Sequence, residues 1–174
     1  EVVRLLCEAK ANPDKAMQDG STALYVASEN GLVEVARLLC EAEADINKAK
    51  HSGATALMMA CQVGHQEVVQ LLCEAAADPD GAMQDGATAL MIAAQNGNLE
   101  SVRLLCEARA DLDKVKQSGA TALYIASLAG HLEVIRLLCE AKANLDKALQ
   151  SGLTPLMIAS NRGHLEVVRL LCEA

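Results

Sequence analysis

The chain has 174 residues and a formal net charge of −8, and it contains two Tyr but no Phe or Trp. Because it has neither a basic stripe nor aromatic side chains on which bases could stack, its composition argues against a nucleic-acid partner. No apolar run approaches the roughly 20 residues of a membrane span, and no charged-then-apolar leader opens the chain, so we expect no membrane partner.

A 33-residue repeat organises the whole sequence. The stretch from Asp85 to Asp111 carries the pattern, and residues 1–9 match residues 34–42, so the chain opens with the second half of a unit. One unit is too small to bury its own apolar residues, so neighbouring units must stack into a continuous core. We predict a single array over residues 1–174, with a half unit over 1–16 and units that start near residues 17, 50, 83, 116 and 149.

Each unit is predicted to contain two short helices, of which the first begins after a Thr and ends at a Gly. Thr is a favoured helix N-cap, and Gly accepts the left-handed backbone that terminates many helices. Pro155 stands at a first helical position, where Pro is favoured. In chain order, the first helices lie between residues 22 and 31, 55 and 64, 88 and 97, 121 and 130, and 154 and 163.

The second helix of each unit carries a Glu in its first turn, which suits the positive end of the helix dipole. Arg37 lies three residues after Glu34 and four before Glu41, so these charges share one face. We interpret the repeated charges as a solvated outer stripe, which Gln70 interrupts. The polar segment that follows, such as residues 44–53, ends in a Gly turn signal and is predicted to form a protruding, hairpin-like finger.

Six of the seven cysteines occupy one repeated position, and the odd one is Cys61. Equivalent positions on stacked helices lie about 10 Å apart, whereas a disulfide needs Cα atoms within about 7 Å. We therefore expect small buried thiols in a reducing compartment, which indicates a cytoplasmic location.

Short motifs connect the repeat to a known family. Residues 154–159 read Thr-Pro-Leu-Met-Ile-Ala, and residues 130–134 and 163–167 read Gly-His-Leu-Glu-Val. With the 33-residue period, these motifs resemble the ankyrin repeat and its Thr-Pro-Leu-His-x-Ala signature. The resemblance covers essentially the whole chain. It implies an all-α ankyrin-repeat solenoid whose units each consist of a finger turn and two antiparallel helices.

Two departures from the family pattern affect local structure. The signature His is replaced by Tyr or Met, so the hydrogen bonds that it makes in the family must be lost or rerouted. The Gly that usually follows the second helix is also missing, and left-handed backbone at another residue costs roughly 1–2 kcal/mol. We predict either φ > 0 or a remodelled turn at Lys10, Glu43, Ala76, Arg109 and Lys142.

The sequence offers no support for catalysis or for a bound cofactor. No His-Glu-x-x-His or Cys-x-x-Cys arrangement occurs, so we expect no metal site. Residues 78–81 resemble the opening of a calcium loop, but Ala89 stands at the twelfth position, where such a loop needs Glu. The Ser residues near the fingers have no base at a supporting spacing, so we predict no catalytic residue and no enzyme activity.

The positions that vary between units are the fingertips and the ends of the first helices, which by resemblance line the concave groove that holds partners. Val63, Leu128, Ala129 and Leu153 are apolar there and form a candidate patch, with neutral drift among units as the alternative. Tyr and Arg are typical interface anchors, so both Tyr and Arg162 are candidates, although the Tyr residues fit helix packing equally well. The candidate partner-binding residues are Gln18, Asp19, Ser21, Tyr25, Glu29, Asn30, His51, Ser52, Gln62, Val63, Gln84, Asp85, Gln95, Asn96, Gln117, Ser118, Tyr124, Leu128, Ala129, Gln150, Ser151, Leu153, Asn161 and Arg162.

We therefore interpret the chain as a non-catalytic protein-protein interaction module that binds a partner protein through this concave surface. Two alternatives stay open. Near-identical units would also suit an engineered or selected ankyrin binding scaffold. The first and last units lack polar capping substitutions, which would suit a self-associating array or spacer that assembles end to end.

Overall fold

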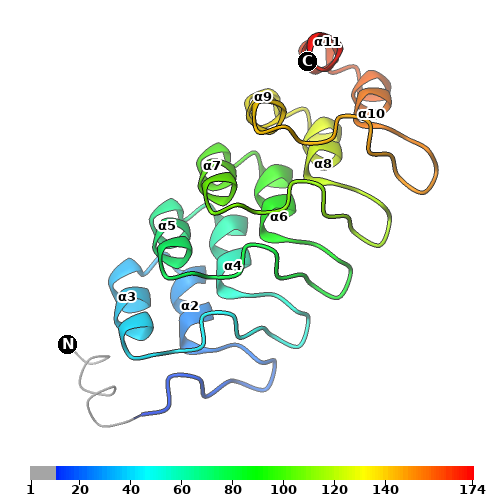
Figure 1. Ribbon diagram of the computed structural model, residues 1–174. Helices are drawn as coiled ribbons and strands as arrows, with labels where there is room; N and C mark the ends of the chain where they lie inside the picture. The colour runs from blue at the N-terminus through cyan, green and yellow to red at the C-terminus, as the bar shows by residue number, and fades with distance from the viewer. Residues whose placement is uncertain (1–10) are drawn as a thin grey trace.

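The computed structural model describes residues 11–174, and within that range the chain forms ten α-helices and no strand. The helices form two parallel rows, and the fingers project from the side of the inner row (Figure 1). The predicted all-α solenoid is confirmed. The inner row consists of α2 (Ala23–Glu29), α4 (Ala56–Val63), α6 (Ala89–Asn96), α8 (Ala122–Ala129) and α10 (Pro155–Arg162). The outer row consists of α3 (Val33–Glu41), α5 (Gln66–Glu74), α7 (Leu99–Glu107), α9 (Leu132–Glu140) and α11 (Leu165–Glu173).

The inner helices begin and end as their capping residues predict. Thr55 has extended backbone, and its Oγ1 accepts a hydrogen bond from the Met58 N–H at 3.3 Å. At the other end of α4, Gly64 adopts φ 88°, and its N–H donates to the Ala60 carbonyl. The same arrangement recurs at α6, α8 and α10. Thr22 caps the start of α2 in the same way, whereas the C-cap of α2 is Asn30, and the left-handed Gly31 follows it. Local sequence alone therefore sets the bounds of these helices.

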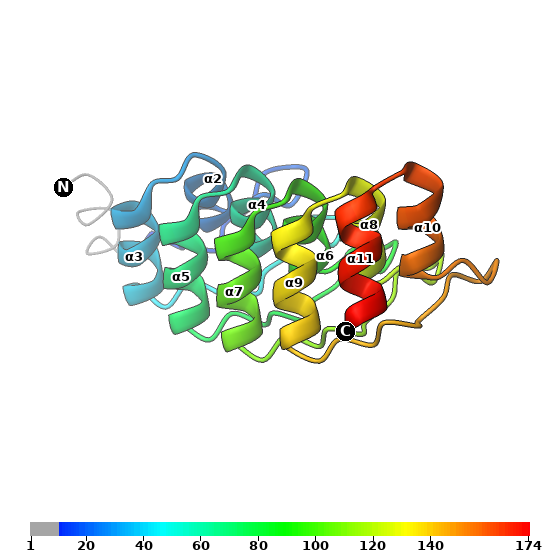
Figure 2. The ribbon, with the colours of Figure 1, turned by 90° about the horizontal axis from the view of Figure 1, so that it is seen from above.

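Stacking of successive helix pairs creates one continuous core. Each inner helix packs on the next inner helix and on the outer helix of its own unit, and Figure 2 shows the outer helices side by side in chain order. Ala60, Ala93 and Ala126 are fully buried at the inner contacts, beside Leu57 and Leu90, which are 1% exposed. Small Ala side chains let neighbouring helix axes approach closely, so the aromatic-poor composition still fills the interior.

The fingers are hairpin turns that bond to one another. The Lys50 N–H donates to the Ala54 carbonyl at 2.9 Å, which closes one finger, and the Gln84 N–H of the next finger donates to the Ser52 carbonyl at 3.1 Å. Gly53 adopts φ 86°, and a Cβ there would lie 2.8 Å from the Met83 Cα. Gly at this turn therefore permits both the left-handed backbone and the close approach of the neighbouring finger.

Hydrogen bonds between units hold the bases of the fingers. Lys48 Nζ donates to the Asp14 carbonyl at 2.9 Å, and Lys114 Nζ donates to the Asp80 carbonyl at 2.8 Å. The Asp45 N–H donates to Asp14 Oδ1 at 2.8 Å, which fixes the base of the same finger. The fingers are thus held by contacts between residues about one unit apart.

The turns after α3, α5, α7 and α9 have left-handed backbone, which is the first of the two predicted alternatives. Glu43, Ala76, Arg109 and Lys142 have φ of 58°, 60°, 62° and 70°. The turn is kept and these side chains accept its strain. Lys10, like all of residues 1–10 in the predicted half unit over 1–16, lies outside the described residues.

The cysteines of the described range are free thiols, and no pair of them is joined. Cys61 is buried as expected, but the repeated position is only half-buried at Cys40 and Cys73, and Cys172 is exposed. The expectation of full burial is wrong at this repeated position because it lies at the border between the core side and the outer side of the second helix. Cys7 lies outside the described residues.

Candidate functional site

The exposed side chains of the fingers and inner helices form one surface, which we call the inner surface. In α8, Ile125, Leu128 and Ala129 lie three and four residues apart and therefore share a helix face. The other faces of this helix are occupied by core residues such as Leu123 and Ala126, which are fully buried. In each inner helix, the side chains at these three equivalent positions thus contribute to the inner surface.

Side-chain amides connect the fingertips. Gln84 Nε2 donates to the His51 carbonyl at 2.8 Å, Gln117 Nε2 to the Gln84 carbonyl at 2.9 Å, and Gln150 Nε2 to the Gln117 carbonyl at 2.7 Å. Each of these amides keeps its oxygen and one N–H for other partners. The fingertips are therefore both fixed in spacing and capable of further hydrogen bonds.

Two ion pairs also link neighbouring fingers. Lys50 Nζ lies 2.8 Å from Asp19 Oδ2, and Lys116 Nζ lies 2.7 Å from Asp85 Oδ2. The hydrogen bond from Lys50 holds the pKa of Asp19 far below its usual range, and the one from Lys116 lowers the pKa of Asp85. Lys50 also lies over the Tyr25 ring, 4.7 Å from its centroid. These lysines are thus already neutralised by contacts within the chain.

The structure places three of the predicted binding residues in the interior. Ser21 is 5% exposed, Tyr25 is 4% exposed and Tyr124 is 6% exposed. Both Tyr side chains pack at helix starts, in agreement with the packing interpretation rather than with a role as exposed anchors. Leu128 is half-buried. The other predicted residues are exposed: Gln18, Asp19, Glu29, Asn30, His51, Ser52, Gln62, Val63, Gln84, Asp85, Gln95, Asn96, Gln117, Ser118, Ala129, Gln150, Ser151, Leu153, Asn161 and Arg162.

The predicted apolar patch is only partly brought together. Val63 ends α4, which α6 separates from α8, so Val63 lies apart from Leu128 and Ala129. Around Leu128 the structure instead assembles a small apolar cluster, which adjoins the main core through Ile125. The sequence analysis did not include Ile125 or Leu149 among the candidate residues. Ile125 could have been found from its spacing of three residues from Leu128 on one helix. The cluster consists of Ala120, Tyr124, Ile125, Leu128, Leu149 and Ile158.

A comparison with protein-family models identifies the family to which the chain belongs. A family model described as ankyrin repeats (3 copies) matches residues 1–50, 47–116 and 108–174. The chain belongs to the ankyrin-repeat family. Ankyrin repeats are generally protein-interaction modules, and the family is typically non-enzymatic. No curated protein matches the chain in a sequence comparison.

The outer side of this ankyrin-repeat chain carries the predicted charge stripe. Arg37 pairs with Glu34 at 3.9 Å and Arg103 with Glu100 at 3.4 Å, and the corresponding pairs recur in α9 and α11. In α5, Gln70 takes the place of the Arg, and its amide donates to Glu74 at 2.9 Å. These side chains are solvated, so each pair contributes only a few tenths of a kcal/mol.

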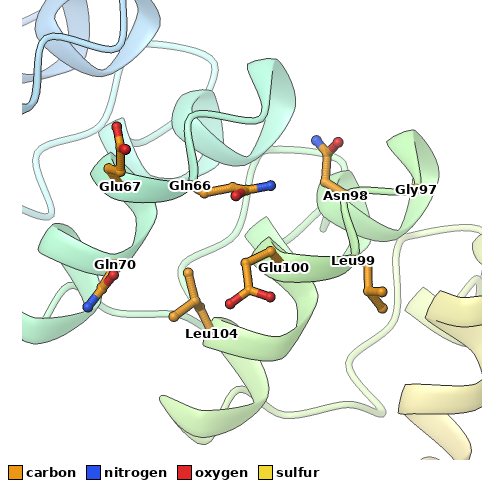
Figure 3. Close-up of a pocket in the computed structure, with 8 residues that line it drawn as sticks. All are labelled: Gln66, Glu67, Gln70, Gly97, Asn98, Leu99, Glu100 and Leu104. Carbon is orange, nitrogen blue, oxygen red and sulfur yellow. The ribbon is translucent and has the colours of Figure 1, made fainter.

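A hollow of about 630 Å³ opens on this outer side between α5 and α7 of the ankyrin array. Figure 3 shows amide and carboxylate side chains around it, with Gln66 extending from α5 toward α7. Among its described lining residues there is no nucleophile beside a base of the kind that acyl transfer uses. The lining residues are Gln66, Glu67, Gln70, Gly97, Asn98, Leu99, Glu100 and Leu104.

The histidines of the ankyrin link have structural hydrogen bonds. His65 Nε2 lies 3.2 Å from the Glu29 carbonyl, and His131 Nε2 lies 3.0 Å from the Gln95 carbonyl. In the part of the chain that the structure describes, no group of three His, Cys, Asp or Glu could hold a metal ion. Over the same residues, no helix has the length and apolar character needed to cross a membrane.

Proposed function

We propose that this ankyrin-repeat chain is a non-catalytic module that holds a partner protein on its inner surface. The observation that carries the proposal is the row of fingers tied together by hydrogen bonds between units, with variable polar side chains exposed along it. A surface that is already ordered loses little conformational entropy when a partner binds. The free side chains on that surface would supply the specificity.

The test is an affinity capture that compares the intact chain with a Leu128→Arg, Leu153→Arg variant. Both changes place a large cation on the inner surface, so we expect captured protein to be lost. A Gln66→Arg, Gln70→Arg variant adds the same charge to the exposed face of α5 and should capture as the intact chain does. Equal capture by all three proteins would remove the inner-surface patch from consideration.

A self-associating array is the second candidate, and specific exposure supports it. Met157 is 53% exposed and Leu165 is 59% exposed on the last helix pair, whereas Met58 and Met91, at the position of Met157, are 2% exposed. If this face joins copies of the chain, the mass measured by sedimentation equilibrium should rise with concentration and should stop rising in a Met157→Lys variant. A constant monomer mass would refute this candidate. A selected binding scaffold would give the same capture results as a natural module.

A further inference from the structure

The apolar cluster around Leu128 differs in chemistry from the rest of the inner surface. The residues equivalent to Leu128 in the other units are Glu29, Gln62, Gln95 and Asn161, all polar and exposed. At Leu128 the surface is apolar, with the half-buried Ile125 and Leu149 packed into the same cluster. A partner side chain that covered these three residues would remove further apolar area from water, at roughly 25 cal/mol per Å².

A cation lies at the edge of this cluster. In the preceding units, Asn96 Nδ2 reaches back to the carbonyl of Gln62 at 3.2 Å. Arg162 stands at the position of Asn96 two units further along, and Leu128 stands at the position of Gln62 in the inner helix before it, so Arg162 and Leu128 lie at adjoining helix ends. His164 Nε2, just after Arg162, lies 3.2 Å from the Leu128 carbonyl and confirms that these two helix ends adjoin.

Arg162 is also a cation that this surface leaves available to a partner. Lys50 and Lys116 are held by Asp19 and Asp85, whereas Arg162 is exposed and takes part in none of the ion pairs found among the described residues. A guanidinium can bind a carboxylate through two parallel hydrogen bonds.

We infer that this site takes an acidic, apolar peptide segment of a partner protein. An apolar side chain of the segment lies on Leu128 and Leu149, and a neighbouring Asp or Glu pairs with Arg162. The inference rests on the proposed function, because it assumes that partners bind the inner surface, and it adds the chemistry of the segment.

The probe is a phage-displayed library of random peptides selected on the intact chain. We expect the enriched peptides to share an apolar residue followed closely by Asp or Glu. Arg162→Glu should weaken the binding of a selected peptide by about tenfold or more, which corresponds to about 1.4 kcal/mol. Arg103→Glu makes the same change in charge on the outer helix α7 and should change the affinity less than about twofold, since exposed charges interact weakly at a distance.

A charge-reversed peptide guards against a variant that simply folds poorly. When Asp or Glu of the selected peptide is replaced by Lys, the peptide should bind the Arg162→Glu variant more tightly than it binds the intact chain. Failure of this rescue, or enriched peptides without carboxylates, would overturn the inference. Peptides that lose binding in Leu128→Arg but tolerate Arg162→Glu would overturn only the acidic chemistry. Peptides that tolerate both changes bind elsewhere and would also contradict the proposed function.

Discussion

Ser101 provides the sharpest test of how the repeats are stabilised. It lies in α7 with no exposed area, and its hydroxyl has no hydrogen-bond partner. The equivalent positions of the neighbouring units hold Val68 and Val134, which are 0% and 2% exposed. The serines of the inner helices differ: Ser28 and Ser127, for example, each donate to the carbonyl four residues earlier at 2.8 Å. The Ser101 hydroxyl is therefore buried without compensation.

We expect Ser101→Val to stabilise the chain by about 2 kcal/mol. An unsatisfied buried hydroxyl costs about 1–3 kcal/mol, and the extra buried carbon of Val adds about 0.8 kcal/mol if the neighbouring side chains accommodate it. Val and Ser have similar helix propensities, so the backbone term is small. With a urea dependence of roughly 2 kcal/mol per M, the unfolding midpoint should rise by about 1 M without a change in slope.

The assay is urea unfolding followed by circular dichroism at neutral pH. Ser101→Ala separates the two contributions, because it removes the hydroxyl without adding volume, and it should be neutral or mildly stabilising. Val134→Ser is the matched control and should lower the midpoint by a similar amount. A drop in the free energy of unfolding by more than about 1 kcal/mol in Ser101→Ala would mean that the hydroxyl is hydrogen-bonded, and the reasoning would be refuted.

Three further predictions concern the fingers and turns. Gly81 occupies the position of Lys48 and Lys114, and it has ordinary backbone with space for a Cβ. Gly81→Lys should therefore add a hydrogen bond to the Asn47 carbonyl and raise the free energy of unfolding by about 1 kcal/mol. Lys114→Gly should lower the free energy of unfolding by a similar amount, as measured by urea unfolding. Arg109 has φ 62°, so Arg109→Gly should raise stability by about 1 kcal/mol, and a lower urea midpoint would contradict the strain argument. The pKa of Asp85 is lowered by its ion pair, so the stability that the pair contributes is present above the unfolded pKa of about 4 and is lost as the pH falls below it. In an acid titration, Asp85→Asn should therefore lose less stability than the intact chain. An unchanged acid profile would count against the pair.

Much of the fold could be predicted because the relevant interactions are local. The Thr caps and Gly stops act within one turn of helix, which is why the bounds of α4 and its equivalents follow from residues such as Thr55 and Gly64. The left-handed residues, such as Arg109, are required by the turn that the 33-residue period imposes. Most of the predicted surface residues are exposed for the same reason, since a fixed position in the unit faces the same way in every copy.

The binding surface was less predictable because its details depend on contacts between units. From the sequence, Tyr25 and Tyr124 fitted exposed anchors and helix packing equally well, and in the structure each is covered by its neighbours. Lys50, from the following finger, lies over the Tyr25 ring. The cluster of Ile125, Leu128 and Leu149 combines a helix with the finger of the next unit. No periodicity within one unit indicates which of these apolar residues meet.

The sequence by itself determined the unit, its two helices, its turns and the stacking that follows from their small apolar faces. Tertiary structure alone decided how much each equivalent residue is exposed. Met58 and Met157 share one position in the repeat, yet they are 2% and 53% exposed. Ser101 is buried, although an isolated helix would expose it to solvent. Burial depends on the helices packed on both sides of a residue, and that is a property of the assembled array rather than of any single unit.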